Sequence, residues 1–573
     1  MAEDLRRLAL KWALRNAVEH GGKAAVGPVI AKLVAEAPEL KRRMGEVKDT
    51  VSRVVEEVNQ LPLEEQRERL AEIAPDLLER RHTREEKKLP PLPGAERGKV
   101  VTRLPPEPSG PMHLGHAMSG LLNEMYARQY DGKLWLRFED TNPRKARLEY
   151  YEVFRRGYRW LGIEWHYEKN NSDDMKLYYE YAEKLLRGGQ LYVCACSADE
   201  LSTQRRTMEP CRHRSQGVGD NLELWKRMLD GDFKEGEAAV RLRGDLKSSN
   251  TAMRDPVMFR VVEHPHPLTG DEYRVWPTYD FAAAVQDAIC GVTHVLRSSE
   301  FAFRDELQNH IRNLLGMRNP VIIEYSRFEF KGTPTSKRLI TPLIEEGVVS
   351  GWDDPRLATV EGVRRRGILP DAIREFTVAQ TGFSYARREY DWSLLYSINR
   401  KILDPRARRL FFVPSPVRLV VAGAPMLSVE IPYHPSRDMG KRILSAGGVI
   451  YVARTDIEKF KPGDEFRLKQ LMNVRLTGVK DGEAYGEFLG VEPKPDIPII
   501  QWVGEDNVAI RVLKPLPLYD EAGELNRNSM ETITGLAEPS VRDVAVDEIV
   551  QFERFGFCRR DYGDELVFIY AHE

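Results

Sequence analysis

The chain is poor in cysteine, with 5 in 573 residues. So few thiols in so long a chain argue against a disulfide framework and predict a reducing, cytoplasmic compartment. The sequence also lacks a run of about 18 or more apolar residues, so we expect no membrane span. Residues 1–6 are partly acidic and are not followed by the apolar core of a signal peptide. We therefore expect a protein that is neither exported nor embedded in a membrane.

Net charge is almost absent as well, because 86 basic side chains face 88 acidic ones and leave −2. A nucleic-acid partner is thus not indicated by overall charge and would need local basic faces. Hydrophobic residues make up 42% and charged residues 30% of the chain, which is typical of a globular protein. The length exceeds the roughly 250–300 residues at which single cores stop growing, so we expect several domains.

Residues 103–116 form the most informative motif, which reads Arg-Leu-Pro-Pro-Glu-Pro-Ser-Gly-Pro-Met-His-Leu-Gly-His. It follows a short apolar run and precedes leucines at helical spacing, so we predict a strand, a loop and a helix start. Backbone N–H groups and the helix dipole at such a loop can hold an anion. His113 and His116 can face the same side, and Gly115 lets a flat ring approach the backbone. This pattern predicts a site for ATP.

A second motif, residues 331–338, reads Lys-Gly-Thr-Pro-Thr-Ser-Lys-Arg. This polar loop is broken by glycine and proline and is suited to moving, so Lys337 could clamp a triphosphate. Attack of a carboxylate on the α-phosphorus of ATP depends mostly on positioning and charge stabilisation. Taken alone, the two histidines could equally be surface or capping residues. Both motifs in this order on an alternating α/β pattern are far more specific.

Two close pairs of metal-type ligands follow later in the chain: Cys194 with Cys196, and Cys211 with His213. Four such ligands can complete a tetrahedral shell around Zn²⁺. Pairs separated by one residue are less standard than pairs separated by two, so reduced structural thiols remain an alternative. With no open ligand position, a bound zinc would be structural.

These motifs together resemble a known family. From about residue 100 to its end, the chain is similar to class I aminoacyl-tRNA synthetases of the glutamyl/glutaminyl subgroup, in the archaeal and eukaryotic form. Residues 103–116 resemble the His-Ile-Gly-His motif, and residues 334–338 resemble the Lys-Met-Ser-Lys-Ser motif. Pro334 departs from the family's lysine, whereas Lys337 is kept. Further matches lie at residues 136–143, 276–281 and 351–357.

The resemblance implies a ligase that activates glutamate with ATP and Mg²⁺ and transfers it to the 3′ end of tRNA. It also implies three sets of site residues. The catalytic residues are His113, His116 and Lys337. The other ATP contacts are Pro108, Gly110, Gly115, Ser336 and Arg338. The amino-acid contacts are Arg103, Glu139, Tyr279 and Arg297.

Arg297 distinguishes glutamate from glutamine in this resemblance, because glutaminyl members tend to place a small uncharged residue there. Arg103 and Arg297 would pair the side-chain carboxylate, and Glu139 would pair the α-amino group. Glutamine would leave a positive charge unpaired in a desolvated site. Ala283 departs from the asparagine or histidine of many members, so one expected polar contact is missing. A glutaminyl ligase and a non-catalytic tRNA-binding protein remain the alternatives.

The predicted fold class is α/β and multidomain. Strands and helices alternate from residue 99, which predicts a parallel sheet with the site at the carboxyl ends of its strands. Short β-rich runs after residue 405 predict one or two β-barrels. With the resemblance, we predict seven segments. They are an N-terminal helical appendage (1–83), a linker (84–98), the first half of a Rossmann-type catalytic domain (99–190), an inserted acceptor-stem-binding domain with the zinc site (191–274), the second Rossmann half (275–330), a mobile Ser-Lys-Arg loop with a helical stem-contact subdomain (331–404), and a β-barrel anticodon-binding region (405–573).

The implied partners are L-glutamate and tRNA(Glu), and the sequence does not decide whether tRNA(Gln) is also charged. The appendage resembles an N-terminal extension of archaeal and eukaryotic members, which would contact tRNA or other translation proteins. A solvated helical pair without a contact role fits it equally well. Residues 364–366, three arginines, match a family block near the tRNA stem, and a solvated charged face remains the alternative for them.

Overall fold

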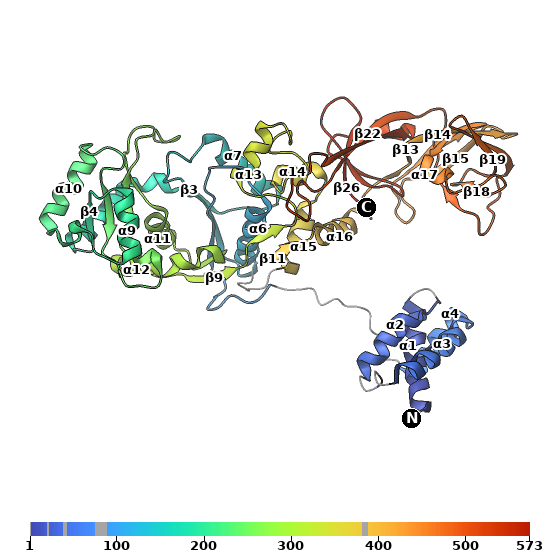
Figure 1. Cartoon of the computed structure of the whole chain (residues 1–573), viewed down its shortest axis with the longest axis horizontal. Helices are drawn as coiled ribbons and strands as arrows, with labels where there is room; N and C mark the ends of the chain where they lie inside the picture. Colours follow the sequence, from blue (N-terminus) through green and yellow to red (C-terminus); the bar gives the residue numbers. More distant parts are fainter. Residues whose placement is uncertain (1, 20–21, 38–39, 41–42, 75–88, 381–387) are drawn as a thin grey trace. The chain divides into compact units, whose positions relative to one another are not determined.

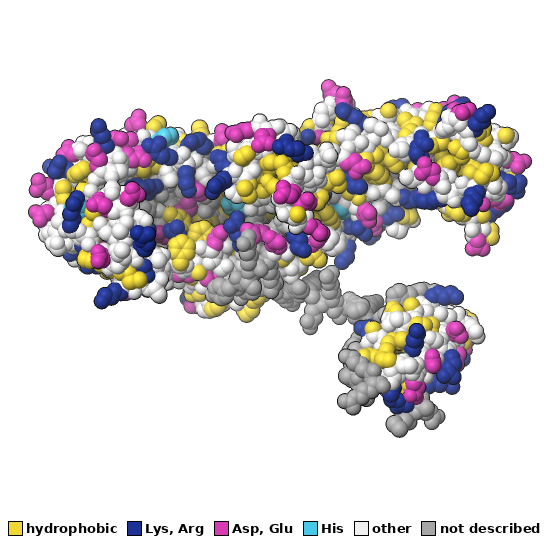
Figure 2. Space-filling model, viewed as in Figure 1, with side chains coloured by type: hydrophobic (Ala, Val, Ile, Leu, Met, Phe, Trp, Pro, Cys, Tyr) yellow, Lys and Arg dark blue, Asp and Glu magenta, His cyan; other side chains and the backbone are white. Residues whose placement is uncertain are grey.

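The computed structural model describes residues 2–19, 22–37, 40, 43–74, 89–380 and 388–573. They belong to two units, Met1–Lys88 and Leu89–Glu573, drawn in Figure 1. The charged first part of the predicted linker, residues 84–88, lies outside the described residues. None of the helices in the described ranges combines the length and the apolar character needed to cross a membrane. On the face seen in Figure 2, basic and acidic side chains are interspersed.

The N-terminal unit is helical, as predicted. Its helices bury an apolar core to which α1 contributes Leu5 and Leu14. Beyond α1, Gly22 has a φ of 97°, a backbone conformation that favours glycine. The helices are α1 (Ala2–Glu19), α2 (Val26–Glu36), α3 (Met44–Asn59) and α4 (Leu63–Ile73).

A parallel sheet forms the centre of the second unit. Strands β1, β2 and β3 pair in parallel, and β8 pairs in parallel with β9. The two groups meet where the N–H of Thr293 donates to the oxygen of Val101 over 2.9 Å. Side by side, the strands therefore run in the order β3-β2-β1-β8-β9. The chain builds the sheet from β1 toward β3 and then, on the other side of β1, from β8 toward β9. Folds of this kind bind ligands at the point between these two halves. The elements are β1 (Val101–Leu104), α6 (Leu114–Gln129), β2 (Lys133–Phe138), α7 (Leu148–Trp160), β3 (Tyr167–Asn170), α8 (Met175–Arg187), α11 (Tyr279–Ile289), β8 (His294–Ser298), α12 (Asp305–Leu315) and β9 (Val321–Tyr325).

An antiparallel sheet of order β4-β5-β6-β7 interrupts this plan. Its core includes the fully buried Trp225 and Trp276. The nucleotide fold was expected to resume at Val275, but β7 pairs with β6 of the insertion, and the parallel sheet resumes only at β8. The elements are β4 (Leu191–Cys194), α9 (Ala198–Thr207), α10 (Val218–Asp230), β5 (Ala239–Leu242), β6 (Val257–Val261) and β7 (Val275–Pro277).

Helices follow the catalytic sheet. The N–H of Leu114 donates to the oxygen of Ala358, and the N–H of Val360 donates to the oxygen of Met112, both over 2.8 Å. The segment before α14 is thereby fixed to the start of α6, more than two hundred residues earlier. The elements are β10 (Phe328–Phe330), α13 (Lys337–Glu345), α14 (Val360–Arg366), α15 (Pro370–Gln380), β11 (Arg388–Tyr390) and α16 (Trp392–Leu403).

Two β-sheets dominate the C-terminal part, which was predicted to form barrels. Their orders are β12-β24-β25-β26-β22-β23-β13 and β17-β14-β20-β19-β18-β21, beside the ribbon β15-β16. Between β22 and β23 the chain reaches back to the catalytic part, where the fully buried Leu518 packs in one cluster with Ile340 and Leu343 of α13. The elements are β12 (Arg409–Leu410), β13 (Phe412–Pro414), β14 (Pro416–Ala422), β15 (Leu427–Pro432), β16 (Lys441–Ala446), β17 (Val449–Ala453), α17 (Arg454–Ile457), β18 (Glu465–Leu468), β19 (Met472–Lys480), β20 (Glu483–Gly490), β21 (Ile499–Ile500), β22 (Val508–Pro515), β23 (Met530–Ala537), β24 (Ile549–Phe552), β25 (Gly556–Arg560) and β26 (Val567–His572).

Candidate active site

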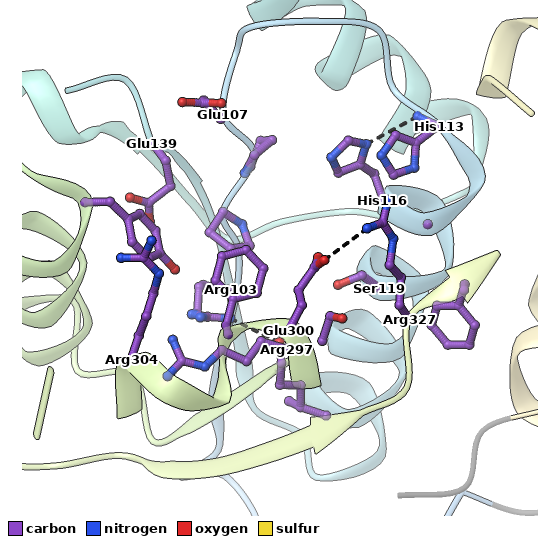
Figure 3. A pocket seen from close by; sticks show the side chains of 18 of the residues that line it. Arg103, Glu107, His113, His116, Ser119, Glu139, Arg297, Glu300, Arg304 and Arg327 are labelled. Atoms are coloured by element: carbon purple, nitrogen blue, oxygen red, sulfur yellow. Dashed lines mark hydrogen bonds and ion pairs between the residues drawn. The ribbon is translucent and has the colours of Figure 1, made fainter. Parts of the chain in front are cut away.

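A cavity of about 520 Å³ opens at the carboxyl ends of β1 and β8. The cavity lies where the winding of the sheet changes direction, its switch point, and the sequence analysis expected the site at the carboxyl ends of the parallel strands. Figure 3 shows the basic and acidic side chains that line it. Seven of the predicted site residues lie on its wall: Arg103, His113, Gly115, His116, Glu139, Tyr279 and Arg297.

The two histidines lie at the N-terminal end of α6, with their ring centroids 3.7 Å apart. The N–H of His113 donates to Nδ1 of His116 over 3.3 Å, which leaves the proton of a neutral His116 ring on Nε2. Burial, helped by the positive charge of Arg327, lowers the pKa of His116 to about 4. Burial also lowers the pKa of His113 well below its ordinary value. Both rings are therefore neutral at pH 7 and can each donate one hydrogen bond.

The ring of His113 can occupy its position because residue 115 is a glycine without a side chain. A Cβ atom at this position would lie 2.9 Å from Cε1 of His113, closer than carbon atoms pack. The ring that lies against Gly115 in the structure is that of His113, and contact of Gly115 with adenine stays a prediction.

Lys337 lies beside the loop of the first motif. Its Nζ donates to the backbone oxygen of Ser109 over 2.9 Å and lies 5.2 Å from the ring centroid of Tyr150. A Cβ at Gly110 would be 3.5 Å from Cδ of Lys337. The structure therefore brings the two motifs together. Five predicted ATP or catalytic residues are nevertheless absent from the cavity wall: Pro108, Gly110, Ser336, Lys337 and Arg338.

Two arginines reach the opposite part of the cavity, one from each side of the switch point. Arg103 on β1 donates through Nη1 to the oxygen of Leu296 over 3.2 Å. Arg297 on β8 donates through Nη1 to Oε1 of Gln308 over 3.0 Å and forms an ion pair with Asp305. Only 2% of Arg103 and 6% of Arg297 is exposed, so a ligand would meet these charges in a desolvated place.

Glu139 follows the end of β2 and is held at both carboxylate oxygens. Oε1 accepts from Nη2 of Arg137 over 2.9 Å, and Oε2 accepts from Nδ2 of Asn171 over 2.6 Å. Burial raises the pKa of Glu139, and the Arg137 guanidinium opposes that rise. The neighbouring Asp140 accepts hydrogen bonds from Ser172 and Tyr151, so its carboxylate is occupied within the protein.

The remaining wall carries charges that the motifs did not single out. Arg304 lies 5.3 Å from the ring centroid of Tyr279 and pairs with Asp280. Arg327 donates to Oε2 of Glu300 over 3.1 Å, the contact drawn beside His116 in Figure 3.

Asp287 on α11 is a buried acid that the sequence analysis missed. Its carboxylate lies 2.9 Å from Nη1 of Arg137 and 3.3 Å from Nε of Arg103. Burial alone would raise the pKa of Asp287, but the surrounding guanidiniums of Arg137, Arg103 and Arg312 hold it below its ordinary value. A signal was present: Asp287 is the one charged residue in the run Phe-Ala-Ala-Ala-Val-Gln-Asp-Ala-Ile-Cys, and a lone charge in an apolar helix needs a partner.

The predicted zinc ligands lie together in the insertion. The donor atoms of Cys194, Cys196, Cys211 and His213 are all within 4.8 Å of one another. Sγ of Cys211 is 3.4 Å from the other two sulfurs and 3.2 Å from Nδ1 of His213. Tetrahedral Zn²⁺ with Zn–S near 2.3 Å requires donor separations of roughly 3.5–3.8 Å. The contacts of 3.2–3.4 Å are slightly shorter, so small shifts of the side chains would let the four donors hold this ion. The buried Arg241 lies with Nη1 3.9 Å from Cys194 Sγ, a charge that suits a thiolate.

The run of arginines at residues 364–366 has partners within the chain. Arg365 donates from Nε and Nη2 to the two oxygens of Asp561. The Arg366 guanidinium lies 5.0 Å from the ring centroid of Tyr396, and Arg364 pairs with Asp547 over 3.5 Å. The contacts of Arg364 and Arg365 join α14 to the C-terminal part, that of Arg366 joins it to α16, and contact with tRNA stays a prediction.

Comparison with known proteins gives three domain matches. Residues 99–405 match the family described as "tRNA synthetases class I (E and Q), catalytic domain". Residues 407–491 and 499–561 match two anticodon-binding domains of the same class.

Full-length relatives are similar along the whole chain. A glutamate–tRNA ligase of Cenarchaeum symbiosum is 43% identical over 99% of this chain and 100% of its own. One of Thermococcus kodakarensis is 42% identical over 100% of both. Among solved structures, a glutamate tRNA ligase from Elizabethkingia meningosepticum matches with 18% identity and a TM-score of 0.40, covering 53% of this chain and 70% of that one.

Proposed function

Since the chain belongs to the class I tRNA synthetases for glutamate and glutamine, we propose that it is a glutamate–tRNA ligase. It activates L-glutamate with ATP to glutamyl-adenylate, and the terminal ribose hydroxyl of tRNA then attacks the activated carbonyl. One observation carries this proposal: a single cavity holds the two histidines of the ATP motif at one part of its wall and two buried guanidiniums at another.

The histidines and Lys337 stabilise the transition state of the first step. Attack on the α-phosphorus spreads negative charge over the phosphoryl oxygens, so donors fixed in advance contribute most. His116 offers Nε2–H because its Nδ1 is occupied by the N–H of His113. Nζ of Lys337 donates to the Ser109 oxygen, and from the first position of α13 its side chain turns to reach the phosphates. Mg²⁺ accompanies ATP and offsets its charge. We assign further ATP contacts to Pro108, Gly110, Gly115, Ser336 and Arg338.

The other part of the wall holds the amino acid. Glu139 pairs with the α-amino group, and Tyr279 closes the pocket beside it. Arg103 and Arg297 pair with the side-chain carboxylate. Glutamine is neutral, so it forms a weaker hydrogen bond with these guanidiniums than the carboxylate of glutamate does. The buried position of both arginines therefore supports glutamate over glutamine.

A glutaminyl ligase is the first alternative, and Arg297 argues against it. A non-catalytic tRNA-binding protein is the second, and the intact His113, His116 and Lys337 argue against that. The choice of tRNA is a separate matter, because a ligase that charges tRNA(Glu) can also charge tRNA(Gln) with glutamate.

We propose a structural Zn²⁺ at Cys194, Cys196, Cys211 and His213. Four protein ligands fill the tetrahedral shell, so the ion orders the insertion and takes no part in catalysis. Partners beyond tRNA, including translation proteins at the N-terminal helices, stay a prediction.

The test is charging of purified tRNA(Glu) and tRNA(Gln) with labelled glutamate and, separately, labelled glutamine. Glutamate on tRNA(Glu) is expected, and its presence on tRNA(Gln) defines the breadth of the tRNA choice. Charging with glutamine alone would establish the first alternative, and charging with neither would contradict the proposed ligase activity.

A further inference from the structure

Asp287 touches both halves of the amino-acid pocket, although it does not line the cavity. One of its oxygens, Oδ1, lies 3.3 Å from Nε of Arg103 and 2.9 Å from Nη1 of Arg137. Arg103 is the guanidinium proposed for the substrate carboxylate. Arg137 in turn donates to Oε1 of Glu139, the acid proposed for the substrate ammonium. A chain of direct contacts therefore runs from one end of the pocket through Asp287 to the other.

The side chains in this series of contacts are buried, so water does not weaken the interactions between their charges. Exposure is 2% for Arg103, 0% for Arg137 and 2% for Asp287. A third guanidinium, that of Arg312, lies 4.0 Å from Oδ2 of Asp287. In a water-poor interior, guanidiniums without a carboxylate between them would repel one another and turn away.

The atoms that take part in these contacts show how the Asp287 carboxylate orients the two guanidinium groups. Asp287 engages Nε of Arg103, and the oxygen of Leu296 engages its Nη1. The remaining Nη2 is left for a ligand in the cavity, which Arg103 lines. On the other side, Asp287 forms an ion pair with Nη1 of Arg137, and Nη2 of Arg137 donates to Glu139. Asp287 thus determines which edge of Arg103 faces the cavity and which edge of Arg137 faces Glu139.

We propose that Asp287 is the positioning residue of the glutamate pocket, fixing at once the cation for the substrate side chain and the anion for its ammonium. The inference rests on the proposed function and adds to it a residue that touches no substrate. Asp287 affects the binding of glutamate before the reaction begins. Its removal therefore raises the KM for glutamate and leaves the KM for ATP unchanged. A residue with a merely structural role would lower the amount of active enzyme and move neither KM.

The test compares Asp287→Asn with a matched variant in full-length enzyme. Glu538→Gln is the control, because Glu538 is also a buried acid, 1% exposed, held by two hydrogen bonds from Arg442, but in the C-terminal sheets. Charging of tRNA(Glu) is measured at varied glutamate and at varied ATP. For Asp287→Asn we expect a KM for glutamate raised about tenfold or more, as the loss of a charged hydrogen bond implies, and a KM for ATP within about twofold of wild type. For Glu538→Gln neither KM moves.

A second variant guards against loss of folding. In Asp287→Asn, three guanidinium groups lose the carboxylate that they share. A double variant, Asp287→Asn with Arg312→Met, also removes one of these three positive charges. The double variant should regain thermal stability but keep the raised KM for glutamate, because the link from Arg103 to Arg137 is still broken.

The outcomes are separable. Failure of the wild type to charge tRNA with glutamate would overturn the proposed function. Normal wild-type charging with an unchanged KM for glutamate in both Asp287 variants, or an equal rise in Glu538→Gln, would overturn only the role of Asp287.

Discussion

Nζ of Lys337 donates a hydrogen bond to the backbone oxygen of Ser109, 2.9 Å away and 228 positions earlier in the chain. This contact joins the two motifs that the reaction requires. Lys337 is also the first residue of α13, whose Ile340 and Leu343 share a cluster with Leu518 of the C-terminal part. The lysine is thus held by one hydrogen bond at its tip and by a packed helix at its base.

Replacing Lys337 with alanine should lower turnover by about a hundredfold or more, because a cation on the phosphoryl oxygens acts mainly in the transition state. The KM for glutamate should change little. Steady-state charging of tRNA(Glu) measures both constants. Lys331→Ala is the matched control from the same loop, and we expect a much smaller loss from it. A large rise in the KM for glutamate with normal turnover in Lys337→Ala would reject the assigned role.

Replacing Arg297 with cysteine should relax the preference for glutamate over glutamine by about tenfold or more, because one buried guanidinium is then absent from the side-chain site. Charging with each labelled amino acid at equal concentration gives the ratio. Arg318→Cys, an exposed position beyond α12, should leave the ratio at its wild-type value. If Arg297→Cys also leaves it unchanged, Arg297 has no part in selection.

The acid dependence of stability should include a contribution from His116. Its pKa is about 4 in the folded protein and near 6.5 in an unfolded chain, so the unfolded chain takes up the proton first as the pH falls. The stabilisation is therefore complete above about pH 6.5 and is lost on going down toward pH 4, by at most about 1.4 kcal/mol per pH unit.

The comparison that isolates this contribution is wild type against His116→Gln, by denaturant unfolding at pH 7 and pH 5. The wild type should lose more free energy of unfolding between the two conditions than the variant does. Equal losses would mean that the His116 ring is not held neutral by burial.

Protein purified without chelator should contain about one zinc per chain by elemental analysis. Cys211→Ser should lose the metal and melt at a lower temperature, because Sγ of Cys211 contacts all three of the other ligands. Cys290→Ala, which removes a buried thiol outside the cluster, should keep the metal. Absence of metal from the wild type would end the zinc assignment.

Local patterns were enough to predict the strand, loop and helix around residues 103–116 and the metal-type cluster, because their residues lie close in sequence. The resemblance added Arg103, Glu139, Tyr279 and Arg297, which the structure brings to one cavity. Their assigned roles stay predictions until they are measured.

Other features depend on contacts that no local pattern encodes. Asp287 acquires its partners from β1 and β2, more than 140 residues earlier, and only its apolar surroundings hinted at it. The strand at Val275 has the same β propensity in either sheet, and its pairing with β6 is decided by tertiary packing. The anchoring of α13 by Leu518 is equally remote in sequence.

The most direct test of the whole account is ATP–pyrophosphate exchange in the presence of tRNA(Glu), with glutamate and with glutamine as the only amino acid in parallel reactions. The account predicts rapid exchange with glutamate, little with glutamine, and loss of the glutamate signal in His116→Gln and Lys337→Ala. Equal exchange with the two amino acids, or full exchange in both variants, would contradict it.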